Sequence, residues 1–492
     1  MSGFSDDDGS VADRAVSHGF PSTARRVHFV GVGGVGMSGV AEMMIELGYE
    51  VSGSDQITSA ATARLSDLGV TVETDHDARW VEAADAVVVS AAVPDDNPEL
   101  TEARRRKLPV ISRGAMLARL ARSRSTVAIT GTHGKSTTSS MVGVALAEAG
   151  LDPGVVVGAR VSAFGSNIRM GRGPYFVLEA DESEPSLLEL TPQIAVITNL
   201  EEEHLDHYGT FDSLRDTMVS FANRVVASGL VVLCADDPEL VRLRDRIGRR
   251  VVTYGLENKT ADTVGNYPVF EAAGSRCMLR YKDQGRSVSI SLQVGVPGRH
   301  NLLNALAVFS VAMEIGIDPE RTVTSLAQFA GVERRFHDLG VAGGVRVIDD
   351  YAHHPTEIDA VLSTARNQPH SRLVAVFQPH RYTRTARFLD AFARVLATAD
   401  VVILADIFAA GEPRMPGITA EHLAAEIRRR PGQFVHHAGS LKNVVDVVVG
   451  LVQPGDIVLT LGAGSIGEVG PRLLDFLKVR AGRLGPENSE GS

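Results

Sequence analysis

Residues 128–140, AITGTHGKSTTSS, decide how the middle of this chain folds. An apolar run enters a glycine-rich turn at Gly131, and a helical stretch is expected from about Ser136. Glycines let the backbone approach a phosphate, and the first N–H groups of a helix favour negative charge. Lys135 suits the β- and γ-phosphates of a nucleotide, and the hydroxyl of Ser136 suits Mg²⁺. The stretch therefore predicts a strand, a phosphate-binding loop and a helix.

The loop is shorter than the usual G-x-x-x-x-G-K-[ST] pattern, because Ile129 stands where the first glycine of that pattern belongs. A glycine-rich loop that arose by chance is the alternative interpretation. The strand before the loop and the helix after it favour phosphate binding, since the pattern has meaning only in that context.

Acidic and histidine side chains follow two further apolar runs, FVLEADES and ITNLEEEHLDH. The candidates are Glu179, Asp181, Glu182, Glu203, His204, Asp206 and His207. Ligands gather at the carboxyl ends of strands in open α/β sheets, and Mg²⁺ prefers carboxylate oxygens. A solvated loop face is the alternative, but two such clusters beside a phosphate loop favour a cation site.

The same unit continues with apolar runs that predict buried strands, and residues 261–294 alternate in the manner of antiparallel strands. A helix is expected over 301–316, opened by polar His300, Asn301 and Asn304. The two asparagines share one face. An asparagine could cap this helix or bind the edge of an adenine, and the sequence leaves both possibilities open.

A glycine pattern near the N-terminus, Gly31-x-Gly33-x-x-Gly36, follows the apolar run RRVHFV. Strand and helix signals alternate over residues 24–123, which predicts a βαβ series with a parallel sheet. The pattern suits a diphosphate at a helix N-terminus, and Asp55 follows at the distance expected for a ribose contact. A tight turn that only packs strand on helix is the alternative. Even a true site does not specify nicotinamide.

A third unit repeats the alternation with the runs GVRVIDDY, RLVAVFQPH, ADVVILADI and GDIVLTLGAG. Arg381 and Arg384 follow a strand end and could hold an amino-acid carboxylate, because arginine pairs bidentately with carboxylates. A transition-metal site at His353, His354 and His380 is less favoured, since no cysteine or regular ligand spacing supports it.

The glycine pattern recurs as Gly462-x-Gly464-x-x-Gly467. Only one helix follows it, so no second strand can supply a ribose-binding acid. Phosphate binding and packing are both open there.

Composition excludes several classes of protein. The 492 residues carry a net charge of −11, which argues against nonspecific binding to nucleic acid or anionic membrane. Cys234 and Cys277 are the only cysteines, so neither a disulfide framework nor a zinc cluster is expected. No signal peptide or membrane span is expected. Residues 1–23 and 481–492 are expected to be disordered.

Taken together, these motifs resemble the Mur ligases. They are HFVGVGGVGMSG, ITGTHGKST, EADES, TNLEEEHLD, GRHNLLNA, GVERRF, DDYAHHPTE, FQPHRYTRT and LGAGSIG, in family order from about residue 26 to about residue 478. The first, seventh and eighth are typical of the branch that adds L-alanine. The resemblance implies an α/β protein with a Rossmann-like UDP-binding domain over 24–123, a central P-loop ATPase-type domain with a mixed sheet over 124–333, and a Rossmann-like amino-acid-binding domain over 334–480.

The resemblance also implies a reaction. In the alanine-adding branch, ATP, UDP-N-acetylmuramate and L-alanine give ADP, phosphate and UDP-N-acetylmuramoyl-L-alanine, through an acyl phosphate on the lactyl carboxylate. This is a cytoplasmic step of peptidoglycan synthesis. It implies ATP and Mg²⁺, no nucleic acid, no membrane insertion, and a monomer or homodimer. The protein then mainly positions ligands and neutralises phosphate charge.

Site residues follow from the same resemblance. The catalytic residues would be Lys135, Glu179 and His204, and the metal ligands Ser136, Glu179 and His204. ATP would contact Gly131, Thr132, His133, Gly134, Lys135, Ser136, Thr137, Asn304, Arg335 and Asp350. The UDP-substrate would contact Gly31, Gly33, Gly34, Gly36, Met37, Ser38, Asp55, Asn167 and Ser183. The amino acid would contact Tyr351, His353, His380, Arg381 and Arg384.

The sequence departs from the family pattern in small ways. Ser136 replaces the commoner threonine and keeps its hydroxyl. Glu184 and Glu203 each stand where aspartate is usual, which leaves Glu203 a weak candidate. No lysine occurs between Lys135 and Lys259, so the carbamylated lysine of several sister ligases is absent from its expected place. A second metal ion would need other ligands.

Three other functions remain open. A Mur-type recycling ligase that attaches a tripeptide would share the UDP and ATP parts. A nicotinamide-dependent dehydrogenase would explain residues 28–55 but leave the phosphate loop without a role. A regulator could bind ATP or UDP-sugar without ligation. The choice of alanine over glycine or serine is not fixed by the sequence, because pockets discriminate small apolar differences weakly.

Overall fold

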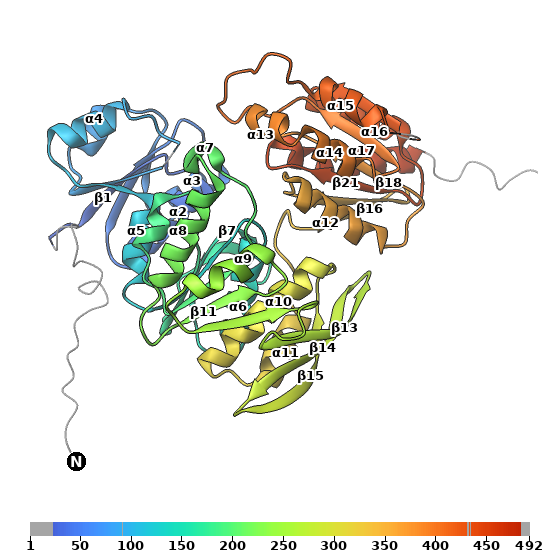
Figure 1. The fold of residues 1–492 in the computed structure, drawn as a ribbon. Helices are drawn as coiled ribbons and strands as arrows, with labels where there is room; N and C mark the ends of the chain where they lie inside the picture. The colour runs from blue at the N-terminus through green and yellow to red at the C-terminus, as the bar shows by residue number, and fades with distance from the viewer. Residues whose placement is uncertain (1–22, 91, 431, 433, 484–492) are drawn as a thin grey trace, which may run out of the picture. The chain divides into compact units, whose positions relative to one another are not determined.

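The computed structural model describes residues 23–483 except residues 91, 431 and 433. Its described strands form three sheets, of five, ten and six strands, and Figure 1 shows helices against the sheets. The α/β class and the three successive sheets confirm the prediction. Most of the two predicted disordered ends lies outside the described residues. Residues 481–483 end the helix α17 (Val469–Arg483).

The first sheet is parallel and has the order β3-β2-β1-β4-β5. Its strands are β1 (Arg26–Val30), β2 (Glu50–Ser54), β3 (Thr71–Glu73), β4 (Ala86–Val89) and β5 (Val110–Ser112). The main helices are α2 (Val35–Glu46), α3 (Ala60–Asp67), α4 (Pro98–Arg105) and α5 (Arg113–Ala121), with the short η1 (Ala78–Val81). All five strands were predicted. The glycine loop follows β1, where the strand order reverses, and open α/β sheets bind ligands at such points.

The second sheet has the order β15-β14-β13-β12-β11-β10-β6-β9-β7-β8. Its strands are β6 (Ser125–Thr130), β7 (Gly154–Val161), β8 (Ser166–Arg169), β9 (Tyr175–Glu179), β10 (Ile194–Ile197), β11 (Leu230–Cys234), β12 (Val251–Gly255), β13 (Thr263–Glu271), β14 (Gly274–Asp283) and β15 (Arg286–Val294). β6 lies between β9 and β10 and runs parallel to both. The ends of β9 and β10 therefore flank the phosphate loop that follows β6.

The predicted strands of residues 261–294 are β13, β14 and β15, which are sheet neighbours joined by two-residue connections. Such connections join antiparallel strands, whereas β13 runs parallel to β12. β7 and β8 were not predicted, and β8 pairs antiparallel with β7. The helices are α6 (Lys135–Glu148), α7 (Leu205–Tyr208), α8 (Phe211–Asn223), α9 (Pro238–Leu243), α10 (Arg299–Ile315) and α11 (Pro319–Ala327), with η2 (Pro185–Glu189) and η3 (Arg244–Arg246).

The third sheet has the order β16-β17-β21-β18-β19-β20. Its strands are β16 (His337–Ala342), β17 (Val345–Asp350), β18 (Leu373–Phe377), β19 (Val401–Ala405), β20 (Phe434–Gly439) and β21 (Ile457–Leu461). All neighbours are parallel except β16 and β17. β18, β19 and β21 are buried throughout, because helices cover both faces of a parallel sheet. The helices are α12 (Pro355–Arg366), α13 (Tyr382–Arg387), α14 (Leu389–Leu396), α15 (Ala420–Arg428), α16 (Leu441–Leu451) and α17, with η4 (Ser465–Glu468).

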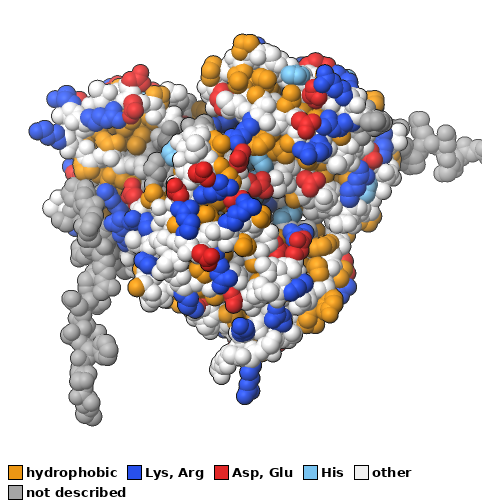
Figure 2. All heavy atoms as spheres, in the orientation of Figure 1, with side chains coloured by type: hydrophobic (Ala, Val, Ile, Leu, Met, Phe, Trp, Pro, Cys, Tyr) orange, Lys and Arg blue, Asp and Glu red, His pale blue; other side chains and the backbone are white. Residues whose placement is uncertain are grey.

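The chain divides into two compact units. One holds the first sheet and most of the second, and the other holds the third sheet with residues 267–277 and 293–302. The predicted domain limits at residues 123 and 333 stay predictions. The described helices lack the long apolar stretch that a bilayer crossing requires. On the face drawn in Figure 2, basic and acidic side chains are intermingled.

Candidate functional site

Two glycines of the phosphate loop have conformations and surroundings that other residues would not fit. Gly131 and Gly134 have φ angles of 123° and 82°, which favour glycine. A Cβ on Gly131 would collide with the Thr198 hydroxyl, and one on Gly134 would lie 2.9 Å from Asn304 Oδ1. Asn304 therefore lies against the loop, as an ATP contact must. Asn301, by contrast, lies inside α10 and donates to the Pro297 carbonyl over 2.7 Å, so it does not cap the helix.

Asn199 fixes the path of the phosphate loop. Its Oδ1 accepts from the His133 N–H over 2.8 Å, and its Nδ2 donates to the His133 carbonyl over 2.9 Å. Its own carbonyl accepts from the Thr132 N–H over 3.1 Å. We did not predict Asn199. Its position just after β10, the neighbour of β6 in the sheet, could have indicated that it lies beside the phosphate loop.

Lys135 folds back over its own loop. Its Nζ lies 2.8 Å from Glu182 Oε2 and 2.8 Å from the Gly131 carbonyl. Burial alone would lower the pKa of Lys135, but the carboxylates of Glu182, Asp181 and Glu179 outweigh it and raise that pKa. The lysine is therefore cationic at neutral pH. Glu182 is fully buried; the sequence suggested it as a candidate cation ligand, but not as the partner of Lys135.

Ser136 and Glu179 form the second contact between the loop and a strand end. The Ser136 hydroxyl donates to Glu179 Oε1 over 2.9 Å, and the Gly158 N–H donates to Glu179 Oε2 over 2.6 Å. Ser136 and the following Thr137 are buried at the start of α6. A hydroxyl and a carboxylate oxygen side by side are the donor types that Mg²⁺ takes.

His204 belongs to a neighbouring group with Asp181 and Glu182, whose potential ligand atoms all lie within 4.8 Å of one another. His204 Nε2 is 3.4 Å from Glu182 Oε1. Burial lowers the pKa of His204, but the carboxylates of Glu182, Glu203 and Asp181 together outweigh it and raise that pKa. The predicted metal ligands are therefore split, with Ser136 and Glu179 in one pair and His204 in this acidic group.

Among the other candidates, the carboxylate of Glu203 also acts on His204, whose pKa it raises. Glu203 is buried, and His207 is exposed with its ring edge against Tyr208. The side chain of Asp206 lies outside the described residues. His204 itself has a φ of 54°, a left-handed conformation that is uncommon outside glycine and gathers at functional sites.

Asp55 shapes the N-terminal glycine loop. Its Oδ2 accepts from the Gly33 N–H over 2.8 Å, and its Oδ1 accepts from the Ile57 N–H over 2.9 Å. Gly31 has a φ of 79°, and a Cβ on Gly33 would lie 2.9 Å from Asp55 Oδ2. Gly34 precedes α2, whose first turns bury Met37 and Ser38. The Asp55 carboxylate thus orders the loop itself.

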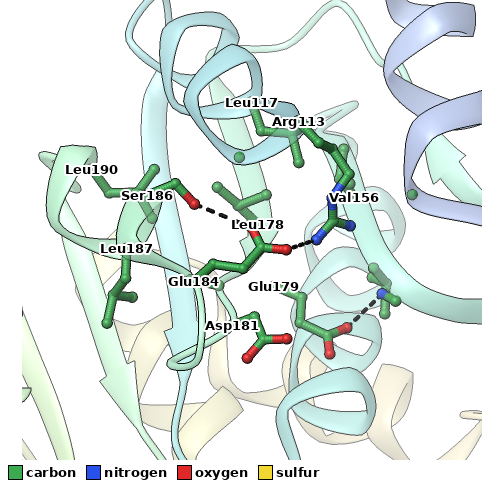
Figure 3. A pocket seen from close by; sticks show the side chains of 15 residues that line it. Arg113, Leu117, Val156, Leu178, Glu179, Asp181, Glu184, Ser186, Leu187 and Leu190 are labelled. Carbon is green, nitrogen blue, oxygen red and sulfur yellow. Dashed lines mark hydrogen bonds and ion pairs between the residues drawn. The ribbon is translucent and has the colours of Figure 1, made fainter. Parts of the chain in front are cut away.

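A pocket connects this loop with the second sheet, and Figure 3 shows it from close by. It is lined by Gly36 and Arg113 on one side and by Leu178, Glu179 and Asp181 at the end of β9 on the other. Glu179 is thus shared between the pocket and the phosphate loop.

Ser183 and Asn167 were also predicted to contact the substrate, and of the two Ser183 binds a residue that lines this pocket, Asp181. Ser183 donates through its N–H and hydroxyl to Asp181 Oδ1, over 2.9 and 2.8 Å. Asn167, in β8, lies close to Gly39 of α2, because a Cβ there would be 3.6 Å from its Nδ2.

In the second unit, four of the five predicted amino-acid contacts cluster. The rings of Tyr351 and His353 are 5.4 Å apart, and those of His353 and His380 are 5.9 Å apart. Arg384 lies 3.3 Å from His380 Nδ1. The His380 ring also stacks on Phe408 at 5.5 Å. A cation and polar rings from the segments that follow β17 and β18 thus lie together.

Arg381, the fifth predicted contact, directly follows His380 and has a strained backbone. Its φ is 69° and its ψ 139°, a region that is essentially confined to glycine. Its N–H donates to the Phe408 carbonyl over 2.8 Å. Strain of this kind persists where the surroundings fix the backbone, and it gathers at ligand sites.

Asp350 is buried at the end of β17. Its carboxylate accepts from the N–H groups of Phe336 and Ala352, over 2.6 and 2.7 Å. Burial raises the pKa of Asp350 to about 6, although the Arg335 guanidinium opposes this. The Arg335 guanidinium also lies 5.1 Å from the centre of the Tyr351 ring.

Protein side chains occupy the space beside two glycines of the second pattern, Gly462-x-Gly464-x-x-Gly467. A Cβ on Gly467 would lie 2.7 Å from the Arg334 guanidinium carbon, and one on Gly464 would lie 2.6 Å from Gln378 Oε1. Gln378 Oε1 also accepts from the Ile466 N–H over 3.0 Å. Of the two open interpretations, these contacts favour packing.

Three family models match successive parts of the chain. The model of the Mur ligase family catalytic domain matches residues 26–125, that of the Mur ligase middle domain residues 129–312, and that of the Mur ligase, glutamate ligase domain residues 334–464.

Curated relatives cover nearly the whole chain. A UDP-N-acetylmuramate–L-alanine ligase of Anaeromyxobacter sp. strain Fw109-5 is 48% identical over 464 residues, 94% of this chain and 99% of that protein. The enzyme of the same name from Halorhodospira halophila is 46% identical over 449 residues, 90% and 92% of the two chains.

Solved structures share the fold. A UDP-N-acetylmuramate-alanine ligase from Thermotoga maritima has a TM-score of 0.78 and 29% identity, covering 92% of this chain and 99% of that one. A murein peptide ligase from Psychrobacter arcticus has a TM-score of 0.70 and 22% identity over the same shares, which is a likeness of fold.

Proposed function

The chain belongs to the Mur ligase family, and we propose that it is the alanine-adding member, which joins L-alanine to the lactyl carboxylate of UDP-N-acetylmuramate with cleavage of ATP to ADP and phosphate. Relatives named for this activity are 45–48% identical over most of the chain. The reaction is an early step of peptidoglycan synthesis, and we place it in the cytoplasm.

One observation carries the proposal: the pocket in Figure 3 reaches from Gly36, at the start of α2 just after the N-terminal glycine loop, to Glu179, which also binds Ser136 at the end of the phosphate loop. A UDP-sugar with its diphosphate at the first loop would thus direct its carboxylate toward the γ-phosphate of ATP. A nicotinamide cofactor would leave this connection and Lys135 without a role.

The chemistry requires position and charge more than a protein nucleophile. The lactyl carboxylate takes the γ-phosphoryl group and becomes an acyl phosphate, which the amine of alanine attacks before phosphate leaves. Lys135 is cationic and would neutralise charge on the transferring group. Gly131 and Gly134 leave room for the phosphates, and Asn304 beside Gly134 would contact the adenine.

Mg²⁺ fits the donors at this site. Ser136 and Glu179 offer a hydroxyl and a carboxylate within 2.9 Å of each other, and His204 lies with Asp181 and Glu182 in the adjacent group. When bound, the ion would neutralise phosphate charge and orient the phosphates. We propose Ser136, Glu179 and His204 as its ligands.

The alanine would bind in the second unit. Arg384 is the cation of the cluster with Tyr351, His353 and His380, and Arg381 directly follows His380. We propose that both arginines bind the alanine carboxylate, because a guanidinium pairs bidentately with a carboxylate. Asp350 and Arg335, in the same unit, would contact the ribose and the phosphates of ATP.

Phosphate release tests the proposal. We expect release only when ATP, Mg²⁺, UDP-N-acetylmuramate and an amine are all present, with a product that carries an amide. A release that does not depend on the amine would support the alternative of a nucleotide-binding regulator. Tight NADH binding unaffected by UDP-sugar would support a dehydrogenase.

A further inference from the structure

An ion pair crosses the pocket of the first unit. Arg113, the first residue of α5, pairs with Glu184, which directly precedes η2, and Figure 3 shows the two side chains directed toward each other. The hydroxyl of Ser186 donates to the other carboxylate oxygen of Glu184 over 3.1 Å. The side chains of Arg113 and Glu184 remain 31% and 26% exposed, so the pair is open to a ligand in the pocket.

Two glycines make room for this pair. A Cβ on Gly36 would collide with the Arg113 guanidinium, and a Cβ on Gly114 would collide with Ser186 and lie 2.7 Å from Glu184 Oε2. Gly36 lies within α2, so no turn requires a glycine there. The third glycine of the pattern Gly31-x-Gly33-x-x-Gly36 therefore admits a guanidinium beside the start of α2.

The charge of the pocket lining singles out Arg113. Among the described residues that line the pocket, Arg113 alone has a cationic side chain, whereas Glu179, Asp181 and Glu184 carry carboxylates. An anionic substrate facing three carboxylates is repelled unless cations balance them. Glu179 lies at the phosphate-loop end, where Mg²⁺ would bind, and Arg113 lies at the Gly36 end.

We propose that Arg113 binds the diphosphate of the UDP-sugar substrate, and that Glu184 holds the guanidinium beside Gly36 until the diphosphate replaces it. This assignment rests on the proposed function, which supplies the UDP-sugar. A guanidinium can donate two parallel hydrogen bonds to phosphate oxygens. The N–H groups at the start of α2 would meet the same diphosphate from the other side.

Ligand binding without ATP or alanine tests the assignment. Titration calorimetry would compare UDP-N-acetylmuramate with UDP-N-acetylglucosamine, which keeps the diphosphate but lacks the lactyl carboxylate. We expect R113A to weaken both by about 10- to 100-fold, because a charge-assisted contact is lost, and R113K to recover part of it. The matched control is R105A, whose exposed guanidinium pairs with Glu102 within α4. Circular dichroism would check the fold of each variant.

E184Q separates ligand binding from a structural role of the pair. If Glu184 only holds the guanidinium in place, E184Q binds both UDP-sugars as tightly as the wild type or several-fold more tightly. An equal loss in E184Q and R113A would show a purely structural ion pair and overturn the assignment. Unchanged affinity in R113A would also overturn it, and a loss confined to UDP-N-acetylmuramate would assign Arg113 to the lactyl carboxylate instead.

Ligation by the wild type, measured in parallel, distinguishes a failure of the proposed function from a failure of the role proposed for Arg113. A wild type that neither binds the UDP-sugars nor ligates them contradicts the proposed function. A wild type that ligates, together with an R113A variant that binds normally, contradicts the role of Arg113 alone.

Discussion

The hydroxyl of Ser136 donates to the carboxylate of Glu179 over 2.9 Å and joins the start of α6 to the end of β9. The two residues meet because β6 and β9 are neighbours in the sheet. Since Glu179 also lines the pocket beside Gly36, one carboxylate connects the phosphate loop with the place proposed for the UDP-sugar. Ligation needs these two substrates side by side, and the pair lies between them.

Removing the Ser136 hydroxyl should weaken the use of Mg²⁺. We expect S136A to raise the Mg²⁺ concentration for half-maximal ADP release by about 10-fold or more, on the scale of other metal-site losses. S136T keeps the hydroxyl and should stay close to the wild type. The measurement is the initial rate of ADP release against Mg²⁺ concentration. An S136A curve that overlays the wild-type curve would remove Ser136 from the metal site.

Replacing Lys135 should abolish turnover while the protein stays folded. We expect K135A to lower kcat by at least about 100-fold, because a preorganised cation facing the transferred phosphoryl group is lost. It also leaves the buried Glu182 without its lysine, which should lower the thermal unfolding midpoint.

The double variant K135A/E182Q separates the two effects of that substitution. It should regain much of the lost midpoint, because the unpaired buried charge is gone, but no turnover. Near-wild-type activity in either variant would rule out the phosphate role of Lys135.

His300 should make stability depend on pH. Burial, with the Arg335 guanidinium nearby, lowers the pKa of His300 to about 4 from the ordinary 6.5. Between these values the unfolded chain binds a proton that the folded chain does not, so stability falls as the pH falls through this window. At pH 5 the effect is about 2 kcal/mol. H300Q should therefore lose less of its unfolding midpoint than the wild type between pH 7.5 and pH 5, and parallel losses would contradict this.

Arg381 should matter for the amine and not for ATP. We expect R381A to raise the KM for alanine or abolish amine-dependent turnover, while nucleotide binding, measured by titration calorimetry, stays unchanged. R387A is the matched control, because Arg387 lies exposed on the same short helix, α13. Unchanged ligation in R381A would show that the alanine carboxylate binds elsewhere.

The sequence predicted the parts of the fold that have a strong local signal. The buried runs of the third sheet are nearly continuous apolar segments, and the shorter strands of the first sheet follow one another with helices between them, as a βαβ series does. β7, β8, β16 and β20 were missed. β8, β16 and β20 are short or half-exposed and carry few consecutive apolar residues, whereas β7 begins with a buried apolar run. A partly solvated strand gives a weaker pattern than one covered on both faces.

The sequence predicted those site residues that belong to a recognisable motif. It did not predict those whose role depends on contacts between segments far apart in the chain. Lys135, Ser136 and Glu179 came from motifs, and the structure brings them together. Other contacts depend on which strands and helices become neighbours. They are the hydrogen bonds of Asn199 to the phosphate loop, the contacts of Glu182 with Lys135 and His204, and the ion pair of Arg113 with Glu184. The substrate contact of Asp55 stays a prediction, and the structure adds that its carboxylate accepts from the Gly33 N–H of the glycine loop.

The addition of L-alanine is tested most directly by measuring phosphate release with ATP, Mg²⁺ and UDP-N-acetylmuramate against a panel of amines. We predict the highest kcat/KM with L-alanine, lower values with glycine and L-serine, and little turnover with a tripeptide. Best turnover with the tripeptide would contradict the account, and would assign the chain to the recycling branch of the family.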